Sequence, residues 1–317
     1  MTHANAKLEA EIQSAWQLWI EISEGRNHGA LEQVYRRYSA YVQEFEAPSA
    51  ALRTWRDRQQ QFGDLFAAAV EVDGSSIAAS APSAWQGKAF KPIPLGTESY
   101  PSQLAEIADA PPILFVEGAS ESLLRPGVAV VGTRKASKAG IVRARKAAEA
   151  LVKSGFTVVS GLAAGIDAAA HSAALESDGV TVAVMGTSID RRYPAANATL
   201  AESIVGQGGA LVSEFPPGTV TRPWHFLRRN RTMSGLTLAT VVIEASETSG
   251  AKSQAFAALE HGRPVFLPQS LTEQHAWAKS LVEEGRRGRR AILVREADEI
   301  AEALAGEAWD TVADIAF

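Results

Sequence analysis

Arginines and aromatic residues alternate in one short segment of the chain. Trp224 and Phe226 precede the run "RRNR" at 228–231, and Arg222 lies just before them. Arginine side chains bind phosphate groups, and aromatic rings stack on nucleic-acid bases. The segment therefore predicts a platform for a single nucleic-acid strand. The alternative interpretation is the start of a surface helix with scattered salt bridges.

A second group of anion-binding residues follows the apolar run "VAVV" at 128–131. Gly132 permits a tight turn and a close approach of the backbone to a ligand. Thr133 and the free amides of the next helix can donate hydrogen bonds to an anion, and Arg134 and Lys135 add positive charge. The segment matches neither the dinucleotide-binding glycine fingerprint nor the Walker A loop.

The run "TVVS" at 157–160 is followed by "GLAAGIDAAAH". Gly161 and Gly165 bracket a tight loop. We expect Asp167 to cap the next helix, and a catalytic carboxylate is the alternative. A lone histidine such as His171 is more typical of a packed or surface position than of a catalytic base.

Two further segments follow apolar runs in the same way. After 239–245, Ser249 and Gly250 begin another helix and form an anion-binding turn. Glu244 ends that run, and we expect it to hold Arg231 or Lys252 in place.

After the run at 181–185, we expect Asn197 to cap a helix. Asp190 is expected to pair with the two arginines that follow it. Tyr193 is expected to pack, and stacking on a base is the alternative.

These polar residues do not form a recognisable catalytic set. The sequence shows no ordered Ser/His/Asp group, no metal-spaced cluster and no close carboxylate pair. We therefore predict no catalytic residues, no metal and no cofactor. Anion binding is the chemistry that the residues favour.

The elements that must position these residues are short apolar strands separated by alanine-rich helices. Strands are predicted at 128–131, 157–160, 181–185, 210–213, 239–245 and 264–267, and helices near 139–153, 167–177, 197–206, 226–236 and 252–261. This alternation predicts an α/β fold, a Rossmann-like doubly wound and mostly parallel sheet. Ligands of such sheets bind at the carboxyl ends of the strands, where all the segments above would converge.

The chain divides into four parts by composition. Residues 1–72 have helical periodicity and predict a small helical module, whereas 73–99 are rich in Ser, Ala, Pro and Gly and predict a linker. Residues 100–270 form the predicted Rossmann-like domain, and 271–317 its C-terminal extension. The extension holds four arginines between 286 and 290, either a solvated turn or a second nucleic-acid contact.

Composition bounds the class of protein. The 317 residues carry a formal net charge of −5, so any nucleic-acid contact must be a local basic patch. The chain has no cysteine, which fits a reducing compartment. No secretory signal or apolar run of membrane-span length is visible, so we expect a cytoplasmic protein without membrane contact.

Taken in order, several segments resemble the DprA/Smf family of bacterial DNA-processing proteins. The match covers roughly residues 99–268 and rests on "VVGTRKAS", "SGLAAGIDAAAH", "GTSIDRRYPAAN", "SEFPPGT", "HFLRRNR", "VVIEASETSG" and "ALEHGRPVF". The resemblance implies a Rossmann-like domain that binds single-stranded DNA and is not generally an enzyme. It also implies a homodimer, a role in natural transformation and homologous recombination, and loading of the RecA recombinase.

The resemblance also implies roles for individual residues. Arg134 and Lys135 would meet phosphates, and Phe226 would stack on a base. The remaining members of the implied nucleic-acid site are Gly132, Thr133, Ser160, Gly161, Gly165, Arg222, Arg228, Asn230, Arg231, Ser249, Gly250 and Lys252. Within "RRNR" we expect Arg228 to bind phosphate, Asn230 and Arg231 to shape the pocket, and Arg229 to be solvated.

Two other functions fit parts of the sequence. Related Rossmann-like domains bind nucleotide derivatives or cleave N-glycosidic bonds, and Asp167 or Glu244 would then supply the carboxylate. The hydrolase signature P-G-G-x-G-T-x-x-E is not found in the chain. In a third interpretation, the tryptophans of the helical module bind a partner protein.

Overall fold

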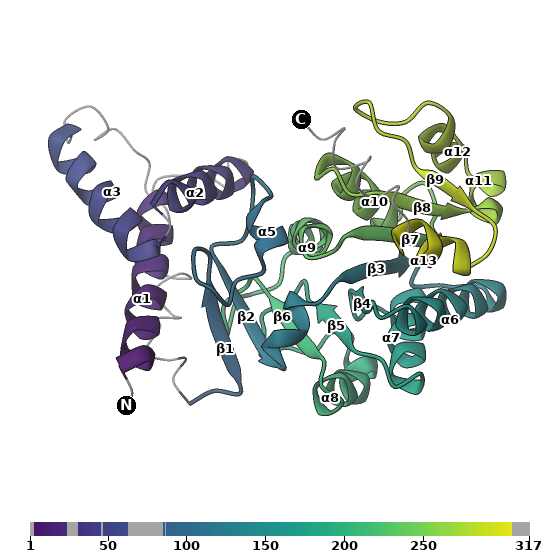
Figure 1. Ribbon diagram of the computed structural model, residues 1–317, viewed down its shortest axis with the longest axis horizontal. Coiled ribbons are helices and arrows are strands. Elements are labelled where there is room, and N and C mark those ends of the chain that lie inside the picture. The colour runs from purple at the N-terminus through teal and green to yellow at the C-terminus, as the bar shows by residue number, and fades with distance from the viewer. Residues whose placement is uncertain (1–2, 24–30, 46, 63–84, 86, 306–317) are drawn as a thin grey trace.

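The computed structural model describes residues 3–23, 31–45, 47–62, 85 and 87–305. Its centre is a nine-stranded sheet in the order β1-β2-β6-β5-β4-β3-β7-β8-β9 (Figure 1). The strands from β6 to β9 run parallel, and β1 and β2 are added antiparallel at one edge. The predicted α/β class and mostly parallel sheet are therefore confirmed.

The six predicted strands correspond to β3 through β8, whereas the sequence pattern predicts no strand at β1 or β2. The strand bounds are β1 Phe90–Pro94, β2 Ile113–Gly118, β3 Gly127–Gly132, β4 Thr157–Ser160, β5 Thr181–Val184, β6 Ala210–Ser213, β7 Ala239–Glu244, β8 Val265–Pro268 and β9 Ile292–Val294. Side chains alternate between the two faces of the sheet. Val128 and Val130 of β3 thus face one helical layer, while Ala129 and Val131 face the other.

Helices cover both faces. The Val128 side packs against α6 Lys138–Lys153, α7 Ile166–Glu176 and α13 Asp298–Ala305. The Val131 side packs against α9 Pro223–Gly235, α10 Gly250–Glu260, α11 Gln269–Gln274 and α12 Ala276–Glu283. Near β5 and β6 lies α8 Ala198–Gly206, and the short elements are α5 Ser102–Ala105, η3 Ser120–Leu124 and η4 Ala195–Asn197.

The N-terminal helices are α1 His3–Ser23, α2 Leu31–Phe45 and α3 Pro48–Phe62, and they lie beside the β1 edge of the sheet (Figure 1). They share its core: Leu18 and Tyr38 belong to the same buried cluster as Ile93 and Val116. The helical prediction is confirmed for the described residues, and the rest of 1–72 lies outside them. The N-terminal helices are therefore attached to the sheet by contacts between buried side chains.

The linker prediction for 73–99 is wrong at its end. Residues 90–94 form β1, paired with β2 over five residues. Two of these five residues are prolines, which cannot donate to a strand ladder and therefore occur on edge strands. Their presence hid the strand from the sequence pattern. Residues 73–84 of the predicted linker lie outside the described residues.

Candidate nucleic-acid interface

A cleft of about 340 Å³ opens at the carboxyl ends of β3 and β7, beside the first turns of α9 and α10. Eight of the residues predicted for the site line it: Gly132, Thr133, Arg134, Lys135, Phe226, Asn230, Ser249 and Gly250. The other lining residues are Val131, Ala163, Asp167, Leu227, Arg229, Met233, Ser246, Ala251 and Gln254. The topology therefore brings four separate segments of the sequence to one place.

The turn after β3 is tied to the end of β7. The Thr133 amide donates to the carbonyl oxygen of Glu244 at 2.7 Å. The Glu244 carboxylate accepts from both the amide and the hydroxyl of Ser137, each at 3.1 Å. The Ser137 hydroxyl in turn caps α6 at Gly140. Glu244 thus fixes the turn that carries Arg134 and Lys135.

The expected partners of Glu244 are therefore wrong. Its carboxylate contacts Ser137 and neither Arg231 nor Lys252. The ammonium of Lys252 instead pairs with Glu247 at 2.8 Å, just outside the cleft lining. No local pattern signals the contact between Glu244 and Ser137, because 107 positions separate them in the sequence.

The floor of the cleft contains a buried guanidinium. Arg229 is 8% exposed, and its Nη1 donates to the carbonyl oxygens of Gly161 and Val184, both at 2.8 Å. Its Nε donates to the side-chain oxygen of Asn230 at 3.1 Å. The expectation that Arg229 is solvated is thus wrong.

Asp167 lies next to this guanidinium. Its carboxylate accepts from the amides of Gly161 and Ala163 at 3.1 and 3.4 Å. Helix α7 begins after Gly165, so Asp167 closes the loop before the helix and the helix-cap prediction is wrong. Burial raises the pKa of Asp167, although the charge of Arg229 and the backbone amides lower it. Burial also lowers the pKa of Arg229.

Phe226 stands at the mouth of the cleft within a group of planar side chains. Its ring covers Gly186, where a Cβ would lie 2.6 Å from the ring. The guanidinium of Arg134 lies 5.4 Å from the centre of the ring, and the ring of Tyr193 lies 5.9 Å from it. Tyr193 is 44% exposed. This group provides aromatic faces beside a cation, the combination that binds bases and phosphates of a single strand.

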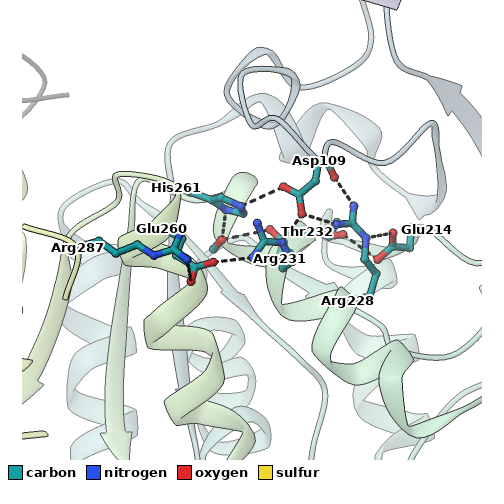
Figure 2. A network of polar contacts seen from close by, with 9 residues as sticks. Asp109, Glu214, Arg228, Arg231, Thr232, Glu260, His261 and Arg287 are labelled. Atoms are coloured by element: carbon teal, nitrogen blue, oxygen red, sulfur yellow. Dashed lines mark hydrogen bonds and ion pairs between the residues drawn. The ribbon is translucent and has the colours of Figure 1, made fainter. Parts of the chain in front are cut away.

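Arg228 and Arg231 belong to a buried ionic network (Figure 2). Arg228 donates to Asp109 at 2.7 Å and to Glu214 at 2.8 Å, and it is 7% exposed. Arg231 contacts Asp109 and pairs with Glu260 at 2.9 Å. Neither lines the cleft, so phosphate binding by Arg228 and pocket shaping by Arg231 are not supported by the geometry.

The same network connects the sheet domain to the helical module. The ring of Tyr35 on α2 lies 3.8 Å from the guanidinium carbon of Arg228. Burial would raise the pKa of Asp109, but the hydrogen bond from His261 and the charges of Arg228 and Arg231 hold it well below its usual value. Arg228 is therefore a structural residue.

The helical periodicity of α9 explains why Arg229 lines the cleft whereas Arg228 and Arg231 do not. Pro223 occupies the first turn, where its missing N–H costs nothing. Residues three or four apart share a helix face, so Phe226, Arg229, Asn230 and Met233 face the cleft. Arg228 and Arg231 belong to another face. This periodicity is the signal that could have identified Arg229 from the sequence.

The remaining predicted site residues support the cleft or lie outside it. The Ser160 hydroxyl is buried and donates to Val130 at 2.6 Å. Gly165 has a φ of +82°, and a Cβ there would lie 2.4 Å from the Thr133 carbonyl oxygen, so it permits close packing beneath the turn. Arg222 is exposed at the start of α9 and does not line the cleft.

Three secondary expectations can also be compared with the structure. His171 is buried and hydrogen-bonded to Thr181 at 2.7 Å, as expected for a packed histidine. Asn197 occupies the cap position of α8, but its side chain donates to the Leu162 carbonyl instead. Asp190 accepts from the amide of Gly218 and does not pair with its neighbours.

Within the described part of the chain, no group of three or more His, Cys, Asp or Glu side chains is placed to hold a metal ion. Among the same residues, no helix is long and apolar enough to cross a membrane.

Comparison with known proteins agrees with the motifs. Residues 91–305 match the model of the family described as DNA recombination-mediator protein A. The chain is 44% identical over 217 residues to Protein Smf of Escherichia coli, covering 67% of this chain and 56% of that protein. It is 42% identical over 177 residues to DNA processing protein DprA of Streptococcus pneumoniae, covering 56% of this chain and 62% of that one.

Solved structures of related proteins share the fold. The X-ray structure of DprA from Streptococcus pneumoniae matches with a TM-score of 0.61 and 30% identity, over 93% of both chains. DprA from Helicobacter pylori, described as having a unique single-stranded DNA binding mode, matches with a TM-score of 0.60 and 26% identity, over 68% of this chain and 95% of that one. The matches to the Escherichia coli and Streptococcus pneumoniae sequences span less than two thirds of each relative's length. The family model alone covers more than half of this chain, which therefore belongs to the DNA recombination-mediator protein A family.

Proposed function

We propose that this protein binds single-stranded DNA in the cleft at the carboxyl ends of β3 and β7. Arg134 and Lys135 contact the phosphates from the turn after β3. The backbone amide of Gly250, at the start of α10, donates to the same backbone. Phe226 stacks on a base at the mouth of the cleft.

The observation that carries this proposal is the convergence of cations, helix amides and an aromatic face on one cleft. The exposed Arg134 and Lys135 and the N-terminus of α10 create a local positive field in a chain of net charge −5, whereas the charge of the buried Arg229 is balanced by Asp167. Phe226 adds a stacking surface within 5.4 Å of the Arg134 guanidinium. Anion binding with stacking is the requirement of a single-strand site.

The proposed biological role follows from the family. Relatives named for DNA processing and a family described as a DNA recombination mediator support a role in DNA processing and homologous recombination. The role in DNA uptake and natural transformation rests on the family resemblance. Loading of a RecA recombinase and assembly as a homodimer in the cytoplasm are further parts of the proposal, and they rest on the family resemblance. In this proposal the protein acts as a binding protein and not as an enzyme.

Fluorescence anisotropy with a labelled oligothymidylate is the direct test. We expect binding at low salt that an unlabelled single strand displaces and that a mononucleotide displaces far less well. A protein that does not bind the oligonucleotide at low salt would contradict the proposal. Because phosphate contacts release counterions, affinity should fall as salt increases.

The second candidate is a nucleotide sensor or an N-glycosidic hydrolase. Asp167 lines the cleft with a raised pKa, and a cleft of about 340 Å³ falls in the size range of small-molecule sites. The contacts of Glu244 to Ser137 leave Asp167 as its candidate acid or base. A thermal-shift screen separates the candidates, since a sensor would be stabilised by a mononucleotide and not by an oligonucleotide.

A further inference from the structure

The four arginines between 286 and 290 belong to a tight hairpin. Arg286 and Arg289 exchange backbone hydrogen bonds of 2.7 and 3.0 Å. The two residues between them, Arg287 and Gly288, have φ values of +50° and +80°, as in a type I′ turn. The Ala291 amide donates to the Leu281 carbonyl and ties the base of the hairpin to α12. The arginines are therefore presented by an ordered turn.

This arginine hairpin (286–290) contacts α10, the helix whose first turn lines the cleft. The contact is on a different face of α10 from the cleft-lining residues Gly250, Ala251 and Gln254. Gly250 lines the cleft at the start of that helix, and Lys252 and Phe256 follow one turn apart. The Arg286 guanidinium lies 4.3 Å from the centre of the Phe256 ring, and the Lys252 ammonium lies 5.9 Å from it. With a rise of about 1.5 Å per residue, Phe256 is roughly 9 Å along the helix from Gly250.

The charge of the hairpin is only partly balanced. Its described ion pairs run to one carboxylate, Glu260, at 3.7 Å from Arg286 and 3.8 Å from Arg287. Glu260 also pairs with Arg231 at 2.9 Å, so one negative charge is shared among three arginines. The Arg287 side chain is 67% exposed, and Arg290 is exposed as well. The outer face of the hairpin keeps its positive charge.

We propose that the arginine hairpin is a second binding site for the backbone of the same DNA strand, which leaves the cleft along the Lys252–Phe256 face of α10. The inference rests on the proposed function of the cleft. Phe256 holds Arg286 in place by stacking, and Arg287 and Arg290 contact the phosphates that follow. A strand long enough to reach the hairpin therefore binds more tightly than one that fills the cleft alone.

The test compares two oligothymidylates, of about 4 and about 16 nucleotides, which bracket the range of known single-strand sites. The test variant is Arg287→Asn with Arg290→Gln, because asparagine before glycine favours a type I′ turn and preserves the hairpin. The matched control is Arg125→Gln with Lys153→Gln, since these exposed cations lie just before β3 and β4, at the amino ends of the strands and opposite to the cleft. Thermal unfolding of all three proteins verifies the fold.

For the long oligonucleotide, we expect the test variant to lower the slope of log affinity against log salt by about 1.4, or about 0.7 for each lost phosphate contact. The short oligonucleotide should bind the test variant and the wild type alike, and the control pair should change neither. Equal slopes for the test variant and the wild type on the long strand would overturn the hairpin site while the cleft stands. A wild type that binds neither oligonucleotide would overturn the cleft and the hairpin site together.

Discussion

Arg229 and Asp167 both form hydrogen bonds to the backbone of Gly161. The carboxylate of Asp167 accepts from the amide of Gly161, and the guanidinium of Arg229 donates to the carbonyl oxygen of Gly161. A Cβ on Gly161 would lie 1.9 Å from Nη1 of Arg229, so this close arrangement requires a glycine. The loop after β4 is therefore fixed by two oppositely charged side chains beneath the cleft.

Removing Arg229 should destabilise the fold. In Arg229→Met, two buried carbonyl oxygens lose their donor and Asp167 is left without its counter-charge. We expect a loss of about 3–5 kcal/mol in the free energy of unfolding, measured by urea denaturation. Asp167→Asn keeps an acceptor for the Gly161 amide, so the double variant should be more stable than Arg229→Met alone. Simple addition of the two single costs would contradict this coupling.

Phe226 should contribute stacking energy to DNA binding. Phe226→Ala is expected to weaken binding by about 1–3 kcal/mol, measured by anisotropy with an oligothymidylate. Phe226→Leu is the matched control because it keeps an apolar side chain over Gly186 without an aromatic face. We expect both variants to be weakened. Full affinity in Phe226→Leu would show that the ring only packs.

Arg134 and Arg228 should behave in opposite ways. Arg134 is exposed at the cleft, so Arg134→Gln should leave stability unchanged and lower the salt slope of binding by about 0.7. Arg228→Gln breaks a buried network with Asp109 and Glu214 and should cost about 3–5 kcal/mol of stability with the salt slope retained. A lowered slope in a stably folded Arg228→Gln protein would contradict its structural role.

His171 should make the fold less stable in mild acid. Burial lowers its pKa from 6.5 to about 3. The unfolded chain therefore takes up a proton that the folded protein excludes, and stability is lost as the pH falls from about 6.5 toward 3. By pH 5 this amounts to about 2 kcal/mol. His171→Leu should reduce the difference in urea stability between pH 7 and pH 5, and an unchanged difference would contradict the assignment.

The sequence predicts the centre of the fold well because its signals are local. The apolar runs and the glycines that follow them are sufficient to place β3, β4 and β7 and to bring "GTRK" near Phe226. The proline-containing β1 cannot be recognised in this way, because it is defined by its pairing with β2 and not by an apolar run of its own.

Helical periodicity could have placed Arg229 on the same face as Phe226, but the partners of Arg228 and Arg231 needed the structure. In "RRNR" the three cations look equivalent, and the start of α9 at Pro223 decides that Arg229 faces the cleft while Arg228 faces Asp109. Asp109 is 119 positions from Arg228, and no spacing rule connects them. Long-range ion pairs of this kind follow from tertiary packing, which a local pattern does not encode.

The salt dependence of oligothymidylate binding to the wild-type protein tests the central claim most directly. The measurement is anisotropy over a series of salt concentrations, with a duplex of equal length for comparison. The cleft predicts binding of the single strand at low salt, with log affinity falling linearly against log salt by about 0.7 for each phosphate contacted. Absence of binding at low salt, or an affinity that does not change with salt, would contradict it.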